Sequence, residues 1–419
     1  MISIISPHYK KTNPYIQEAY QSLTTQTVKE WEWIIVQNNG GEIPGEIVDD
    51  PRVKVSESDL SGVGALKRFA CQQASGDIIV ELDMDDMLTP QALQEITIAF
   101  EDKVVGFVYS NCAEFHNETW EPRVFSEYWG WKSRPFQYEG HELQEMVAFP
   151  PSPHALRTIW WAPNHVRAWR VADYWEIDGH NPDMAVADDH DLCCRFYLHG
   201  KMKHIDKCLY LYRIHEDNTW IRENGDVQVG MWRNYSKYII PMAEKWAVDN
   251  KLALLDLGAG FNKPVNYFGI DIQPGSDFQH DLNKGLPMNH STVGIIRAHD
   301  ILEHLSDPVH LLNECYRVLA PGGWLNISVP STDGRGAFQD PTHVSFWNEN
   351  SFWYYTNPKF AQYVPEIRCR FQVSRILTWY PSAWHKEHDI SYVDAQLIAV
   401  KKGYEPIGEC LWSKANKES

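Results

Sequence analysis

The sequence lacks the features that would place the chain in a membrane, in an oxidising compartment or along nucleic acid. No apolar run approaches the roughly 18–20 residues of a membrane-spanning helix, and the N-terminus has neither the basic region nor the apolar core of a signal peptide. The 8 cysteines form no Cys-x-x-Cys pair, so a reducing, cytoplasmic location is expected. The net charge of −18 argues against a broad basic surface that binds nucleic acid, but it does not exclude a small basic cleft.

What is present is an ordinary globular composition, with 43% hydrophobic and 22% charged residues. The 419 residues exceed what one hydrophobic core usually serves, so two domains are expected. Strand-like and helix-like segments alternate from Ile2 onward, and a second alternation begins at Leu252. Such alternation predicts an α/β fold with a mostly parallel sheet. The predicted domains cover residues 1–226 and 251–419, joined by a helical linker over residues 227–250.

The strongest local signal is a group of carboxylates directly after an apolar strand. Asp83, Asp85 and Asp86 follow the segment Asp77–Leu82, and a helix-like segment comes next. Carboxylates this close repel each other unless a cation lies among them. Hard oxygen ligands suit Mg²⁺ or Mn²⁺, such as the ion that accompanies a nucleotide diphosphate. A solvated acidic turn ahead of a helix is the plain structural alternative.

Two later motifs and the opening strand complete a recognisable order. Ala187–Leu192 holds the pair Asp188-Asp189, and Tyr210–His215 ends on a histidine. Together with the acidic loop and the opening segment Ile4–Tyr9, these motifs resemble the family-2 glycosyltransferases of the GT-A fold. The resemblance covers roughly residues 1–225 and rests on the combination of motifs.

The resemblance implies a role for each matching residue. The general base is Asp189, and a divalent metal is held by Asp83, Asp85 and His215. The donor nucleotide is contacted by Pro7, Tyr9, Asn38, Lys67, Arg68 and Asp83. A base that takes the acceptor's proton and a metal that stabilises the departing diphosphate suit a single inverting displacement. Gln37-Asn38-Asn39 stands where many members carry an acidic pair. A UDP-linked donor is therefore implied by the family and not by these three residues.

Residues from about 114 to 163 are rich in Trp, Phe, Pro and Arg and lack clean periodicity. We expect a long irregular insertion. It lies between the acidic loop and Asp189, where the family that this half resembles builds its acceptor site. The predicted acceptor residues are Trp161, Asn164, His165 and Asp188. Aromatic rings stack on sugars and on exposed bases alike, and arginines suit an anionic glycan or a DNA backbone. The stretch therefore locates the acceptor without identifying it, and some of its tryptophans belong to the core.

The second half carries a glycine-containing loop after a strand, Leu254–Gly260, and an aspartate at the end of the next strand. This order resembles class I S-adenosylmethionine-dependent methyltransferases over roughly residues 250–419. The resemblance implies cofactor binding by Asp256, Gly258, Gly260, Asp271, Asp281 and His299.

One feature of this half departs from the methyltransferase pattern. Only Phe261–Tyr267 separate the glycine loop from the second strand, too few for a crossover helix of about a dozen residues. A degenerate module kept for dimerisation or acceptor docking is therefore an alternative. The segment Gln339–His343 is expected either to line an acceptor pocket or to form a simple turn.

The sequence thus predicts an inverting, metal-dependent transferase that moves a sugar from a nucleotide diphosphate to a hydroxyl of a surface glycan. The second domain would methylate the same product with S-adenosylmethionine. One alternative acceptor is a hydroxymethylated base of phage DNA, which the acidic total charge disfavours. Another alternative is a non-catalytic glycan-binding scaffold. A homo-oligomer is compatible with the sequence.

Overall fold

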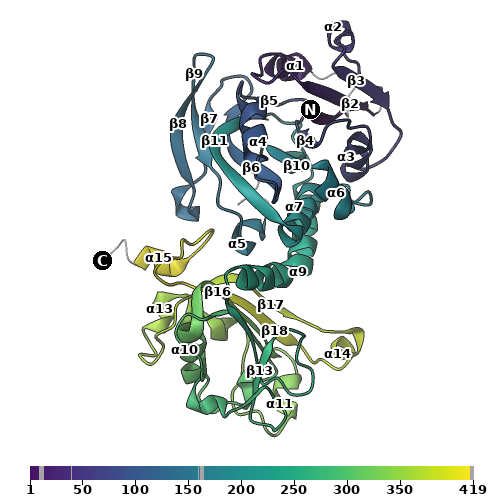
Figure 1. Cartoon of the computed structure of the whole chain (residues 1–419). Coiled ribbons are helices and arrows are strands. Elements are labelled where there is room, and N and C mark those ends of the chain that lie inside the picture. The colour runs from purple at the N-terminus through teal and green to yellow at the C-terminus, as the bar shows by residue number, and fades with distance from the viewer. Residues whose placement is uncertain (9–13, 39, 159, 161–164, 416–419) are drawn as a thin grey trace. The chain divides into compact units, whose positions relative to one another are not determined.

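The computed structural model describes residues 1–8, 14–38, 40–158, 160 and 165–415. The chain divides into two compact units, Met1–Met242 and Ala243–Ser419, and each is described by itself (Figure 1). The boundary lies inside the segment expected to link the domains.

The first unit is built on a mixed, mostly parallel sheet with the strand order β3-β2-β1-β4-β10-β6-β11-β5. Strands β1 to β4 run parallel to one another, whereas β10 is inserted antiparallel between β4 and β6. The strands are β1 Ile2–His8, β2 Trp31–Gln37, β3 Val53–Glu57, β4 Ile78–Glu81, β5 Met87–Leu88, β6 Val105–His116, β10 Arg167–Arg170 and β11 Lys201–Ile214.

Helices follow most of the strands and complete the α/β pattern expected from the sequence. They are α1 Ile16–Thr24, α2 Gly45–Val48, α3 Val63–Gln72, α4 Ala92–Ala99, α6 Val171–Glu176 and α7 Asp188–His199. Ile4, Ile35, Val80 and Val108 are fully buried in the core around the sheet. Near-continuous apolar runs such as Trp33–Val36 form central strands because both faces of a parallel sheet are covered.

The segment expected to be an irregular insertion contains a β-hairpin, so that expectation was wrong. It is composed of β7 Pro122–Arg123, η1 Glu127–Trp129, β8 Lys132–Tyr138, β9 His141–Val147 and α5 Pro153–Leu156. Strands β8 and β9 pair antiparallel and are connected by the two-residue turn Glu139-Gly140. Both turn residues have positive φ, as a tight hairpin turn requires. Most of β8 is exposed, so its sequence carries no alternation of apolar and polar residues.

A long helix, α9 Asn224–Asp249, follows the short helix α8 Thr219–Arg222. The first part of α9 supports the start of α7. The Asn234 amide donates to the carbonyl of Ala187 at 3.0 Å, and the Tyr238 hydroxyl donates to Asp191 at 2.6 Å. The segment expected as a linker therefore also positions the helix that carries Asp188 and Asp189.

The second unit contains a sheet with the strand order β14-β13-β12-β15-β16-β18-β17. Strands β14 to β16 are parallel, and β18 and β17 are antiparallel. The strands are β12 Ala253–Leu257, β13 Phe268–Asp271, β14 Phe278–Gln279, β15 Val293–His299, β16 Leu319–Pro330, β17 Phe371–Trp379 and β18 Tyr392–Ala399. This Rossmann-like order confirms the expected fold of the second half.

The helical segments of this unit are mostly short. They are η2 Leu282–Lys284, η3 Leu302–His304, α10 Pro308–Val318, α11 Gly336–Gln339, η4 Glu349–Phe352, α12 Trp353–Thr356, α13 Pro358–Ala361, α14 Ala383–Glu387 and α15 Leu411–Ala415. Residues 258–267, all of them described, form no helix between β12 and β13. The shortened crossover deduced from the sequence is therefore present.

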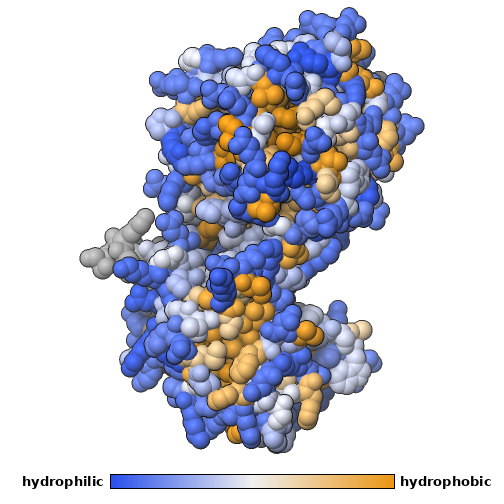
Figure 2. Space-filling model, viewed as in Figure 1, coloured by the Kyte–Doolittle hydropathy of each residue, from blue (hydrophilic) through white to orange (hydrophobic). Residues whose placement is uncertain are grey.

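In the part of the chain that the structure covers, no helix combines the length and the apolar character needed to cross a bilayer. Figure 2 shows hydrophilic residues over most of the visible face of each unit, with separate apolar patches between them.

Gly64 in α3 provides a test of how the loop before α7 is positioned. Its N–H donates to the carbonyl of Met184 at 3.2 Å, and an added Cβ would collide with the carbonyl oxygen of Asn181. We predict that Gly64→Ala lowers the free energy of unfolding by about 1–3 kcal/mol, because backbone must shift to admit the methyl group. Chemical denaturation measures this change. The control Gly225→Ala meets no atom within 4 Å, and equal destabilisation of both variants would contradict the prediction.

Candidate active site

The acidic loop after β4 is fastened to the end of β11 by its third carboxylate. Asp86 is buried and accepts hydrogen bonds from the Tyr210 hydroxyl at 2.8 Å and from the backbone N–H of Arg213 at 2.7 Å. The Arg213 guanidinium donates to the carbonyl of Asp85 and pairs with Glu18 at 2.6 Å. Asp86 therefore holds the loop in place, while Asp83 and Asp85 stay partly exposed.

Asp85 and His215 meet although 130 positions separate them in the chain. The Nε2 atom of His215 lies 2.8 Å from a carboxylate oxygen of Asp85. Burial, together with the charges of Glu81 and Asp85, raises the pKa of nearby Asp83 to about 7 against the opposing effect of Lys67. Asp85 and His215 thus offer one carboxylate and one imidazole to a divalent ion. In the same loop, one ligand atom each of Asp83, Asp86 and His165 lie within 4.8 Å of one another, so carboxylates and an imidazole suited to a cation gather here.

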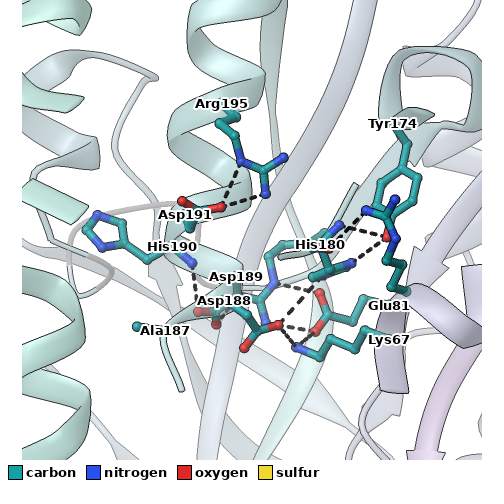
Figure 3. A network of polar contacts seen from close by, with 12 residues as sticks. Lys67, Glu81, Tyr174, His180, Ala187, Asp188, Asp189, His190, Asp191 and Arg195 are labelled. Carbon is teal, nitrogen blue, oxygen red and sulfur yellow. Dashed lines mark hydrogen bonds and ion pairs between the residues drawn. The ribbon is translucent and has the colours of Figure 1, made fainter. Parts of the chain in front are cut away.

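A buried ion network lies behind this loop and centres on Glu81 at the end of β4 (Figure 3). Glu81 forms an ion pair with the Lys67 ammonium at 2.5 Å and accepts a hydrogen bond from Nη2 of Arg167 at 3.3 Å. Nε of Arg167 lies 3.1 Å from the other Glu81 oxygen. Lys67 also lies 3.4 Å from Asp188, and Arg167 lies 2.6 Å from Asp189. Two cations from α3 and β10 thus hold three carboxylates from β4 and α7.

The network sets different protonation states for its carboxyl groups. Burial would raise the pKa of Asp189, but Arg167 and Lys67 outweigh it and hold this pKa well below the usual range. The same two cations overcome burial at Glu81 and lower its pKa to about 2. At Asp188 burial prevails over Lys67 and, with the negative charge of Asp189, raises the pKa to about 6.

Only one of the two adjacent aspartates offers an edge to an incoming molecule. The side chain of Asp189 is 24% exposed, whereas that of Asp188 is 5% exposed. One oxygen of Asp189 also accepts from the backbone N–H of His190 at 2.7 Å, in the first turn of α7. A carboxylate that is ionised, fixed in direction and partly exposed has the attributes of a general base.

The residues predicted to contact the donor occupy different environments. The Asn38 amide donates to the carbonyls of Ser58 and Leu60 at 2.8 and 2.9 Å and so ties two loops at the strand ends. Lys67 is buried in its ion pairs, and Arg68 is paired with Asp178 at 2.6 Å. Both charges therefore neutralise protein carboxylates. Pro7 lies within β1, and Tyr9 is outside the described residues.

The predicted acceptor residues are only partly described. Trp161 and Asn164 lie outside the described residues. His165 is 7% exposed and stacks on Tyr210 and Tyr212, with ring centroids 4.4 and 5.1 Å away. Its ring offers a ligand atom within 4.8 Å of those of Asp83 and Asp86, so His165 packs against the acidic loop. Its contact with an acceptor stays a prediction.

Several aromatic residues of the insertion, together with Trp220 of α8, cluster around Arg123. Its guanidinium carbon lies 4.6 Å from the ring of Trp220 and 5.6 Å from that of Trp160. Phe125 contacts both Trp131 and Trp160. Trp169, in contrast, is fully buried. The tryptophan-rich stretch thus divides between the core and this cluster.

In the second unit, the predicted cofactor residues gather at the carboxyl ends of parallel strands. Gly258 and Gly260 have positive φ after β12. Asp271, which ends β13, accepts from the N–H of Gly260 at 2.9 Å and from that of Gln273 at 2.7 Å. Each of its oxygens keeps a second lone pair for a ribose hydroxyl. These residues fit a nucleoside cofactor at the edge where such sheets bind ligands.

The other three predicted residues differ in their surroundings. Asp256 is fully buried and pairs with Arg297 at 2.8 Å, so it joins β12 to β15. Asp281 caps η2 by accepting from the N–H of Asn283 at 3.0 Å. His299, at the end of β15, lies 3.1 Å from the Asn326 amide, and burial lowers its pKa to about 3. Asp256 therefore has a structural role through one of its oxygens, and its contact with a cofactor stays a prediction.

The two sheets and their carboxylate-rich edges define a two-domain α/β enzyme. Residues 3–157 match the glycosyl transferase family 2, and residues 242–327 match the methyltransferase domain family. The chain therefore carries a family 2 glycosyltransferase domain followed by a methyltransferase domain. This confirms the resemblance found in both halves of the sequence.

Individual relatives match parts of the chain. Hyaluronan synthase of Pasteurella multocida is 26% identical over 231 residues, which are 54% of this chain and 22% of that protein. A probable S-adenosylmethionine-dependent methyltransferase of Mycolicibacterium smegmatis is 32% identical over 75 residues, 17% of this chain and 29% of that protein. TarS of S. aureus in complex with UDP has a TM-score of 0.41 and 17% identity, covering 58% of this chain and 70% of that chain. The chain thus spans about a fifth of the synthase, 22% of its length.

Removing the central ammonium of the network tests its contribution to stability. We predict that Lys67→Met lowers the free energy of unfolding by about 3–5 kcal/mol near neutral pH, because Glu81 and Asp188 lose a buried partner. The wild-type pKa of Glu81, about 2, lies below its usual 4.5. Its contribution is therefore complete above pH 4.5 and is lost as the pH falls toward 2.

The difference between wild type and Lys67→Met should accordingly shrink on acidification, as measured by denaturation at a series of pH values. The control Lys201→Met breaks an exposed pair with Asp102 and should change stability little. A difference that is constant from pH 7 to pH 3 would contradict the ionic origin of the effect.

Proposed function

We propose that the first domain transfers a sugar from a nucleotide diphosphate to an acceptor hydroxyl with inversion at the sugar carbon, and that Asp189 is the general base. The observation that carries the proposal is the state of Asp189, which is ionised by Arg167 and partly exposed at the start of α7. A sugar hydroxyl is a poor nucleophile near neutral pH, so a carboxylate within hydrogen-bond reach must accept its proton.

Asp83, Asp85 and His215 are the residues that would hold a divalent metal, Mn²⁺ or Mg²⁺. When bound, the ion would stabilise negative charge on the departing diphosphate. The protein's part is to fix this loop, which it does through Asp86, Tyr210 and the backbone of Arg213. Asn38 would position the nucleotide, and a UDP-linked donor is the expectation from the family.

Inversion of configuration at the sugar carbon follows because a single base acts and no protein nucleophile takes part. One base removes the acceptor proton on one side of the sugar carbon, while the diphosphate leaves on the other side. No second nucleophile is invoked, so the acceptor oxygen displaces the leaving group directly. Asp188, buried and paired with Lys67, positions Lys67 and the start of α7. Its predicted contact with the acceptor is therefore replaced by this positioning role.

A surface glycan is the acceptor class that we favour. The similarity to a hyaluronan synthase supports it, as does the net charge of −18, which disfavours extended contact with DNA. The aromatic residues around Arg123 suit stacking on a sugar ring with an anionic substituent nearby. Hydroxymethylated DNA is the alternative acceptor class, and a direct assay distinguishes it from a glycan.

The second domain would methylate the same product with S-adenosylmethionine. Gly258 and Gly260 would admit the cofactor to the backbone, Asp271 would bind its ribose, and Asp281 and His299 would lie beside it. Linking the two domains in one chain raises the effective concentration of the glycosylated intermediate.

The base is tested with Asp189→Asn, which keeps the size of the side chain but cannot accept a proton. We predict that transfer falls by about 10²–10⁴-fold, the range for a lost general base, while the dissociation constant for the nucleotide changes little. Diphosphate release with Mn²⁺ and a panel of sugar nucleotides measures transfer, and calorimetry measures nucleotide binding. The control Asp183→Asn alters an exposed residue of the loop that precedes α7 and should retain activity.

The same reactions identify the acceptor class when oligosaccharides and DNA containing 5-hydroxymethylcytosine are offered separately. Mass gain on the oligosaccharide, absent with Asp189→Asn, supports the proposal. Mass gain on the modified nucleoside would move the acceptor to DNA. Full activity of Asp189→Asn on either acceptor would reject this residue as the base.

A further inference from the structure

A cluster of two imidazoles and a carboxylate lies in the second domain, apart from the residues assigned above. Glu303, His304 and His343 each offer one ligand atom, and these atoms all lie within 4.8 Å of one another. Glu303 and His304 belong to η3, which directly follows β15, and His343 comes from the loop after α11. The cluster is therefore at the carboxyl end of a parallel strand, the edge where α/β sheets bind ligands.

The carboxylate of this cluster has no internal partner for one of its oxygens. Glu303 is 2% exposed, and its Oε2 atom accepts no hydrogen bond within the described residues. An isolated buried carboxylate is costly, so such a group normally pairs with a cation or takes up a proton. The surroundings of Glu303 thus favour a positive charge at this place.

Hydrogen bonds fix both histidines in the tautomer that a metal requires. Nδ1 of His343 lies 2.9 Å from the carbonyl of Ala337, which can only accept, so Nδ1 carries the proton. Nδ1 of His304 lies 3.0 Å from the Thr342 hydroxyl, whose own proton is donated to Asp340 at 2.7 Å. Both rings therefore keep the Nε2 lone pair for a cation, supported from the opposite nitrogen as in established metal sites.

The loop that carries His343 is held firmly against η3. The N–H groups of Val344 and Ser345 donate to the carbonyl of Glu303 at 2.7 and 3.0 Å. The Ser345 hydroxyl donates to the carbonyl of Leu302 at 2.8 Å. The ring centroids of His304 and His343 are 5.0 Å apart. These contacts bring the three side chains together before any ion binds, which lowers the entropic penalty of binding.

From this arrangement we infer a second divalent-cation site, formed by Glu303, His304 and His343, that binds Zn²⁺ or Mn²⁺. Two imidazoles with one carboxylate suit such ions better than Mg²⁺ or Ca²⁺, which prefer oxygen ligands alone. A tetrahedral ion with bonds of about 2.1 Å holds its ligand atoms about 3.4 Å apart, so small side-chain rotations complete the site.

Three protein ligands leave at least one coordination position open, as in sites that bind a water molecule or a substrate oxygen. The open position would receive an oxygen of a molecule bound at this edge, and an acceptor hydroxyl is the class that the methyltransferase domain would use. A bound cation makes such a hydroxyl more acidic. The assignment of the cation itself is independent of the proposed glycosyl transfer.

The test uses the full chain freed of metal and titrated with Zn²⁺ or Mn²⁺ alone in a calorimeter. The first-domain site also binds cations, so the variants are compared in the Asp85→Asn background as well as in wild type. His343→Gln should abolish one binding event in both backgrounds or weaken it by more than about 100-fold, beyond the loss of a supporting partner alone. The control His290→Gln, an exposed histidine of the same domain, should bind as wild type does.

Two further measurements keep the test decisive. Thr342→Val removes only the hydroxyl that supports His304 and should weaken binding by about 10–100-fold. Co²⁺ bound by the wild-type chain should give visible absorption bands that change in His343→Gln and persist in Asp85→Asn. Equal stoichiometry, affinity and Co²⁺ spectra for wild type, His343→Gln and His290→Gln would overturn the site.

Discussion

The first domain depends on one buried interaction, the contact of Arg167 and Lys67 with Glu81 behind the acidic loop. Moving charged groups out of water costs several kcal/mol for each ion, so these side chains are stable there only because each cation meets more than one carboxylate. Arg167 joins Glu81 to Asp189, and Lys67 joins Glu81 to Asp188. The network therefore links β4, β10, α3 and α7 at the point where the chemistry is proposed.

The same network assigns unequal roles to chemically identical groups. Asp188 is enclosed and has a raised pKa, whereas Asp189 is ionised and partly exposed. The guanidinium that keeps Asp189 ionised also weakens it as a base. Proton transfer to such a base is favourable only late in the reaction, when attack on the sugar carbon has made the acceptor hydroxyl acidic. Arg167 thus makes the base available over a wide pH range at the expense of its strength.

Much of the fold was predictable, because apolar runs indicate buried parallel strands and turn residues indicate where those strands end. Asp85 and His215 were paired from a resemblance, and the structure brings them to 2.8 Å. Glu81 was not predicted, because an acid at the end of an apolar strand looks like the first residue of a loop. Arg167 was not singled out either, because nothing in its local sequence distinguishes it from the other arginines nearby. Both depend on contacts between distant segments, which local sequence does not encode.

Other expectations differed from the structure for related physical reasons. The hairpin β8–β9 escaped prediction since its first strand is mostly exposed and has no apolar alternation. Lys67 was expected at the donor because its charge was considered without its partners. In the second domain, the glycine loop and Asp271 come together as expected, since parallel strands end at one edge.

The central claim is that Asp189, and not Asp188, accepts the proton. The most direct measurement is kcat/KM for glycosyl transfer against pH at saturating Mn²⁺, since its acidic limb reports the essential base of the free enzyme. Because the pKa of Asp189 is held well below the usual range, activity should stay nearly constant from pH 8 down to about pH 5. An acidic limb centred near the value of about 6 that belongs to Asp188, and lost in Asp188→Asn, would contradict the account.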